Sequence, residues 1–133
     1  MFINFGSISY LALVIGAVAY MVYGGIYYSV VLSSKKESNK MILGQQSSGP
    51  FKYIYSVILA FISSFFMAIL IQSIGPEVVM TGAVVGFMVG LLLSLVYLKN
   101  TLFGLLSGKS CMIAIGDHLV AFTLLGFIHG LFI

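Results

Sequence analysis

The chain has 133 residues, of which 61% are hydrophobic and only 7% are charged, and its mean hydropathy is +1.18. A soluble domain carries roughly a quarter charged residues, so a fold in water could not cover this much apolar surface. The net charge of +3 does not indicate a nucleic-acid partner in such a chain, and the single cysteine excludes an internal disulfide. These properties predict an integral membrane protein whose partner is the lipid bilayer.

Four apolar segments follow one another along the chain. The first belongs to an uncharged stretch that is longer than the roughly 20 residues a helix needs to cross a bilayer. A polar loop with a Ser-Ser-Gly-Pro run precedes the second segment, and Gly75-Pro76-Glu77 predicts a tight turn before the third. We therefore expect an all-α four-helix bundle in one membrane domain, residues 1–133, with spans at about 8–32, 51–74, 78–98 and 111–133 and loops at 33–50 and 99–110.

The basic residues predict the direction of the spans. All six are lysines, and all lie in or beside the two predicted loops. In a four-span chain these two loops lie on one side of the membrane, and both termini lie on the other. Because cytoplasmic loops carry an excess of lysine and arginine, we expect both loops inside and both termini outside. The expected location is the plasma (inner) membrane of a microbe.

Glycines recur at helical spacing within the spans. Membrane helices associate through close packing of small residues and through hydrogen bonds, and residues four apart share one face of a helix. These rows either bring the helices of one chain together or form a subunit interface, and a homo-oligomer is a candidate assembly for so short a chain. The predicted packing glycines are Gly16 and Gly24 in the first span, Gly82, Gly86 and Gly90 in the third, and Gly126 and Gly130 in the fourth.

Ionisable residues inside the fourth span are the candidate site. Asp117 and His118 lie roughly 10 Å inside the cytoplasmic boundary, and such residues usually face the protein interior or a water-filled cavity. His129 lies about three turns further on, which predicts a shared face with His118 near the external boundary. Tyrosines of the first span are predicted at about the same depth in the membrane as Asp117 and His118, and their hydroxyls need hydrogen-bond partners. The predicted cluster is Asp117, His118, His129, Tyr20, Tyr23, Tyr27 and Tyr28.

This cluster has two interpretations. The favoured one is a structural clasp, a hydrogen bond between the first and fourth spans that fixes their register. The other is a site for a proton or ligand, because a carboxyl beside an imidazole is how proteins move pKa values. The two histidines and one aspartate are too far apart along the chain for a metal site. We expect no cofactor, and no set of residues typical of enzyme catalysis is found.

Several short motifs follow one another along the chain: Gly24-Gly25-Ile26-Tyr27-Tyr28-Ser29, Thr81-Gly82-Ala83-Val84-Val85-Gly86-Phe87, residues 100–103, Gly116-Asp117-His118-Leu119-Val120 and residues 126–130. In this order they resemble a family of small membrane proteins, the domain-of-unknown-function 1761 family. The similarity covers nearly the entire chain and implies a four-span fold, but no activity. The family often has tryptophan where this chain has Tyr27, and a longer polar first loop.

The sequence favours a structural or accessory bundle, packed through glycine-rich helix faces, as the function. The alternative is a small oligomeric permease or channel with a polar path at Asp117, His118 and the tyrosines of the first span. A membrane enzyme has the weakest support, because the chain lacks arginine and has few acids. Transport requires Asp117 to be accessible to water, whereas the accessory function predicts that it is buried and hydrogen-bonded.

Overall fold

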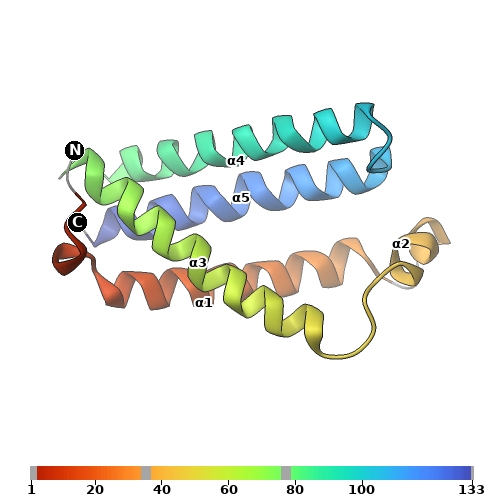
Figure 1. Ribbon diagram of the computed structural model, residues 1–133, viewed down its shortest axis with the longest axis horizontal. Coiled ribbons are helices and arrows are strands. Elements are labelled where there is room, and N and C mark those ends of the chain that lie inside the picture. Colours follow the sequence, from red (N-terminus) through yellow and green to blue (C-terminus); the bar gives the residue numbers. More distant parts are fainter. Residues whose placement is uncertain (1–2, 34–36, 76–78, 133) are drawn as a thin grey trace.

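The computed structural model describes residues 3–33, 37–75 and 79–132. Four long helices within these residues form a bundle (Figure 1), and each is long and apolar enough to cross a membrane. The predicted all-α four-helix fold is therefore confirmed, and the chain is a multi-pass membrane protein. The elements are η1 (Phe5–Ser7), α1 (Tyr10–Val31), η2 (Glu37–Asn39), α2 (Lys40–Gly44), α3 (Phe51–Ile74), α4 (Val79–Leu102) and α5 (Gly108–Leu131).

Local chemistry sets the ends of these helices. The hydroxyl oxygens of Ser9 and Ser107 accept hydrogen bonds from backbone N–H groups in the first turns of α1 and α5. Such N-caps satisfy donors that have no partner inside the helix. Helix α3 stops at Gly75, whose φ of 94° lies in the left-handed region that favours glycine.

Some predicted boundaries differ from the observed ones. Helix α3 has the predicted bounds, but α4 continues to Leu102 and α5 begins at Gly108, so the loop predicted at 99–110 is a short turn. A helix can continue past the apolar segment because its backbone hydrogen bonds do not depend on lipid, and Gly104, with a φ of 80°, closes the turn. The polar loop after α1 contains the short helix α2. Residues 76–78, which include the predicted Pro76-Glu77 turn, and residue 133 lie outside the described residues.

Helices α4 and α5 lie antiparallel along their whole length, whereas α3 crosses α1 and α5 at an incline (Figure 1). Helix α1 contacts both α3 and α5, and α3 has little contact with α4. The buried residues of α3 are confined to Ala60–Ile71, and most of its first two turns are exposed in the chain. Because α3 is inclined, it lies beside α5 toward one end of the bundle and away from α5 toward the other end (Figure 1).

Backbone contact between α4 and α5 depends on the glycine row of α4. A Cβ atom added at Gly90 would lie 2.7 Å from the carbonyl oxygen of His118, and one at Gly86 would lie 2.8 Å from the carbonyl carbon of Phe122. Real Cβ atoms do not approach backbone this closely, so only glycine fits. Gly82 likewise faces Gly126. The structure places this row against a helix of the same chain.

The glycines of the first span differ in their surroundings. A Cβ at Gly16 would meet the Ser64 hydroxyl at 2.6 Å and the side chains of Leu125 and His129, so Gly16 lies where α1, α3 and α5 converge. A Cβ at Gly24 would meet nothing within 4 Å, so Gly24 does not pack against another helix of this chain. At that level long tyrosine side chains connect α1 and α5, and the two backbones stay apart. In the fourth span, Gly130 lies close to the backbone of Val79.

The lysines that the structure describes gather at one end of the bundle. Lys40 begins α2, Lys52 lies in the first turn of α3, and Lys99 and Lys109 flank the turn between α4 and α5. These elements lie at the end of the bundle opposite the two termini (Figure 1). Lys35, Lys36 and Glu77 lie outside the described residues. The external position of both termini and the cytoplasmic position of the loops stay predictions from this distribution.

Candidate functional site

The carboxyl group of Asp117 lies between α1 and α5. Its residue is only 6% exposed, and the Tyr28 hydroxyl donates a hydrogen bond of 2.8 Å to its Oδ2 atom. The other oxygen, Oδ1, forms no hydrogen bond with the residues that the structure describes. The carboxyl therefore connects two helices through one oxygen, and its other oxygen has no hydrogen-bond partner among the described residues.

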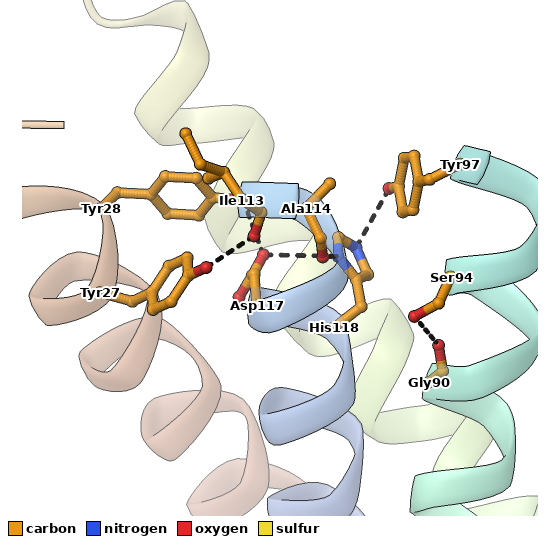
Figure 2. A network of polar contacts seen from close by, with 9 residues as sticks. All are labelled: Tyr27, Tyr28, Gly90, Ser94, Tyr97, Ile113, Ala114, Asp117 and His118. Carbon is orange, nitrogen blue, oxygen red and sulfur yellow. Dashed lines mark hydrogen bonds and ion pairs between the residues drawn. The ribbon is translucent and has the colours of Figure 1, made fainter. Parts of the chain in front are cut away.

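His118 extends the network from α5 to α4 (Figure 2). Its Nδ1 atom lies 2.8 Å from the carbonyl oxygen of Ala114, and a carbonyl can only accept, so Nδ1 carries a proton and donates it. In the neutral ring the Nε2 atom is then an acceptor, and the Tyr97 hydroxyl lies 3.2 Å from it. The distance between Nδ1 and Asp117 Oδ2 is 3.6 Å. Tyr28, Asp117, His118 and Tyr97 thus form one polar row across three helices.

Tyr27 makes a second connection between α1 and α5. Its hydroxyl donates a hydrogen bond of 2.7 Å to the carbonyl oxygen of Ile113 (Figure 2). A Cβ at Gly116 would lie 2.6 Å from this hydroxyl, so the glycine that precedes Asp117 leaves space for the tyrosine. The Ile113 carbonyl already accepts a helical hydrogen bond from residue 117, and a carbonyl oxygen has two lone pairs. The tyrosine uses the second one.

Two other predicted tyrosines lie nearby without a hydrogen bond to the carboxyl or the imidazole. The Tyr20 ring packs edge-on against Phe122, with ring centroids 6.2 Å apart, and contributes to the hydrophobic core around Leu125. The Tyr23 ring stacks on Tyr27 at 5.7 Å. Their contribution to the site is aromatic packing that surrounds the polar row.

His129 belongs to a different polar group, which we call the outer pair: His129 and Ser64. The Ser64 hydroxyl donates to the carbonyl oxygen of Leu13 at 2.8 Å, and His129 Nε2 lies 3.0 Å from Ser64 Oγ. The sequence predicts that the two histidines share a face of the helix. In the structure they contact different helices, because His118 contacts α4 whereas His129 contacts α3. The incline of α3 explains this, since α3 reaches α5 only toward the end where the termini lie (Figure 1).

Two residues of these polar groups, Tyr97 and Ser64, are absent from the cluster predicted from the sequence. Tyr97 lies in the third predicted span at a depth that matches His118, so depth matching applied to that span could have found it. Ser64 is one of two adjacent serines in the middle of the second predicted span, and a buried hydroxyl inside lipid needs a partner. A third serine, Ser94, forms a hydrogen bond of 2.8 Å with the Gly90 carbonyl of its own helix (Figure 2).

The network can hold helices in register and can hold a proton, because it contains a carboxyl, an imidazole and two phenols. Within residues 3–33, 37–75 and 79–132, no three His, Cys, Asp or Glu side chains are grouped so that they could hold a metal ion.

A family model described as a protein of unknown function, DUF1761, matches residues 11–130, and the chain belongs to this family. The match covers α3 and α4 in full, α1 and α5 except for one terminal residue of each, and both polar groups. A search of curated proteins found no match, and neither did a search of solved structures.

Proposed function

We propose that this member of the family is a structural or accessory membrane bundle that works without transporting a solute. In this proposal the row Tyr28–Asp117–His118–Tyr97 is a clasp that fixes the register of α1, α5 and α4. The observation that carries the proposal is the burial of Asp117 with a hydrogen bond to a neighbouring helix. Asp117 therefore faces the interior of the bundle, as ionisable residues inside a membrane usually do.

The direction of the polar row supports this role. The row runs across the bundle from α1 to α4 (Figure 2), whereas a transport path must run along the bundle. Along α5, Asp117 and His129 are separated by about 18 Å. Phe122 and Leu125 lie between them and pack into the hydrophobic core. The Thr123 hydroxyl in the same interval donates to the Leu119 carbonyl of its own helix.

The glycine contacts support the same role. Because Gly82, Gly86 and Gly90 pack against α5 of the same chain, they are not available as a subunit interface while α4 and α5 are packed together. The faces of α4 that remain exposed are lined by large apolar side chains, Met80, Val84, Phe87, Met88, Leu92, Leu95 and Val96. An accessory protein would meet lipid or a membrane partner through such faces.

Asp117 substitutions test the clasp. Asp117→Asn keeps one acceptor for Tyr28, so we expect it to melt close to the native protein in detergent. Asp117→Leu removes the acceptor and should destabilise the bundle by about 1–2 kcal/mol, as for an interhelical hydrogen bond in a membrane. Liposomes that contain the native protein should show the same proton and cation flux as empty liposomes.

One observation favours the permease as a second candidate: the Oδ1 atom of Asp117, which has no hydrogen-bond partner among the described residues. Such an oxygen can take a proton or a cation. The permease predicts flux in the native protein and loss of that flux in Asp117→Asn with unchanged stability. This result would overturn the structural proposal.

A further inference from the structure

A cavity of about 270 Å³ is lined by residues from the N-terminal and C-terminal parts of the chain and from the end of α3. Segments from three parts of the chain surround it: the start of α1, the last turns of α3 and the end of α5. Its lining is mixed: Ile8, Ala12, Ala68, Ile71 and Phe132 are apolar, and Ser7, Ser9, Gln72 and His129 are polar. A cavity lined by both apolar and polar side chains suits an amphipathic molecule.

The state of His129 follows from the hydrogen bonds of the outer pair. Ser64 donates its only proton to the Leu13 carbonyl, so its oxygen is an acceptor toward His129 Nε2, and Nε2 carries the proton of the ring. A charged ring is disfavoured there, because His129 is 4% exposed and none of the described residues that line the cavity is acidic. In the neutral ring Nδ1 is an acceptor. It has no hydrogen-bond partner among the described residues.

Gln72 supplies a second free acceptor. Its Nε2 group donates to the Asn4 carbonyl oxygen at 3.1 Å and to the Ser7 hydroxyl, which fixes the side chain. Its Oε1 atom forms no hydrogen bond within the part of the chain that the structure describes. Two neutral acceptors, with no lysine among the described lining residues, select a ligand that donates hydrogen bonds and carries no negative charge.

We propose that this cavity binds an uncharged hydroxyl-bearing group, such as the glycerol head of a neutral lipid, with His129 Nδ1 and Gln72 Oε1 accepting from its hydroxyls. The apolar lining residues would contact the adjoining part of an acyl chain. The proposal is independent of the clasp at Asp117, which lies about 18 Å away along α5. The same hydroxyl chemistry is found in a soluble polyol, so the test includes both sources.

The experiment uses photo-crosslinking in phosphatidylcholine nanodiscs, because sugar-headed detergents carry the same hydroxyl chemistry as the ligand. The probe is a monoacylglycerol with a diazirine in its acyl chain. We expect labelled peptides from residues 68–75 or 129–132. Unlabelled monooleoylglycerol should compete, whereas free glycerol should compete only at far higher concentration. Competition by glycerol at equal concentration would keep the hydroxyl site and assign it to a soluble polyol.

Two variants make the test specific. Gln72→Leu removes one acceptor and should raise the half-saturating probe concentration roughly two- to tenfold, as for loss of one neutral hydrogen bond. The matched control Gln45→Leu makes the same change at an exposed position outside the cavity and should leave this concentration unchanged. His129→Phe should also weaken labelling. If His129→Phe fails to fold, the comparison of Gln72→Leu with Gln45→Leu alone tests the proposal. Labelling elsewhere, or equal labelling of Gln72→Leu and Gln45→Leu, would overturn the proposal.

Discussion

Replacement of Gly86 by alanine tests the contact between α4 and α5 most directly. The added Cβ would lie 2.8 Å from the Phe122 carbonyl carbon and 3.1 Å from the Thr123 Cα atom, whereas ordinary contact begins at 3.4 Å. Both obstacles are backbone, so no side-chain rotation relieves them, and the two helices must separate. Inserting one methyl group into a packed interior typically costs about 1–3 kcal/mol. We expect Gly86→Ala to lie at the upper end of this range, since the α4–α5 contact is the most extensive in the bundle.

Gly24→Ala is the matched control. Gly24 is also a helical glycine, but a Cβ there would meet nothing within 4 Å. Alanine favours a helix over glycine by about 1 kcal/mol at either position, so the difference between the two variants isolates the steric contact. The measurement is the free energy of unfolding, followed by far-UV circular dichroism in mixed micelles of detergent and SDS. Gly24→Ala should unfold at the same or a higher SDS fraction than the native protein, and Gly86→Ala at a lower one.

If Gly86→Ala unfolded at the same SDS fraction as Gly24→Ala, the close approach of α4 and α5 would be refuted. Size-exclusion chromatography adds a second readout. If the glycine row formed a subunit interface instead, Gly86→Ala would change the size of the assembly and leave the unfolding of the monomer unaffected.

Three further changes test the rest of the structure. Lys40→Cys in a Cys111→Ala background should react with a membrane-impermeant maleimide only after cells are opened, because lysine-rich loops are cytoplasmic. Labelling in intact cells would show that the predicted topology is wrong. Tyr28→Phe removes the hydrogen bond between α1 and the carboxyl of α5 and should lower the free energy of unfolding by about 0.6–2 kcal/mol. If the variant unfolded like the native protein, this hydrogen bond would not contribute to stability. Gly16→Ala should destabilise strongly in the same assay, because its Cβ would lie 2.6 Å from a buried hydroxyl, whereas Gly25→Ala has open space; equal effects would contradict the convergence of three helices there.

The fold could be predicted because the cost of placing a residue in lipid depends mainly on that residue and its depth. The uncharged stretch before the first polar loop predicts a span whatever its neighbours are, and α3 has the bounds that hydropathy gives. Helix ends beyond the apolar segment, such as α4 at Leu102, depend on backbone hydrogen bonds that hydropathy does not describe. The short helix α2 escaped prediction for the same reason.

The candidate site could be predicted only in part. A carboxyl in a membrane span is costly wherever it lies, so Asp117 stands out in the sequence, and depth matching led to Tyr27 and Tyr28 on α1. The partners Tyr97 and Ser64 lie on α4 and α3, and nothing in the sequence says which helix faces each histidine.

The sequence by itself determined the number of spans, the crowding of lysines at one end and the presence of polar groups within the membrane. The tertiary structure alone decided which surfaces meet: the Gly86 face against α5, Gly24 in open space, and His129 against α3 while His118 contacts α4. The physical reason is that lipid solvates every apolar face equally well, so the helices lack the polar side that would mark the outside of a soluble bundle. Close packing and a few hydrogen bonds then select the arrangement, and both depend on atoms that only the folded chain brings together.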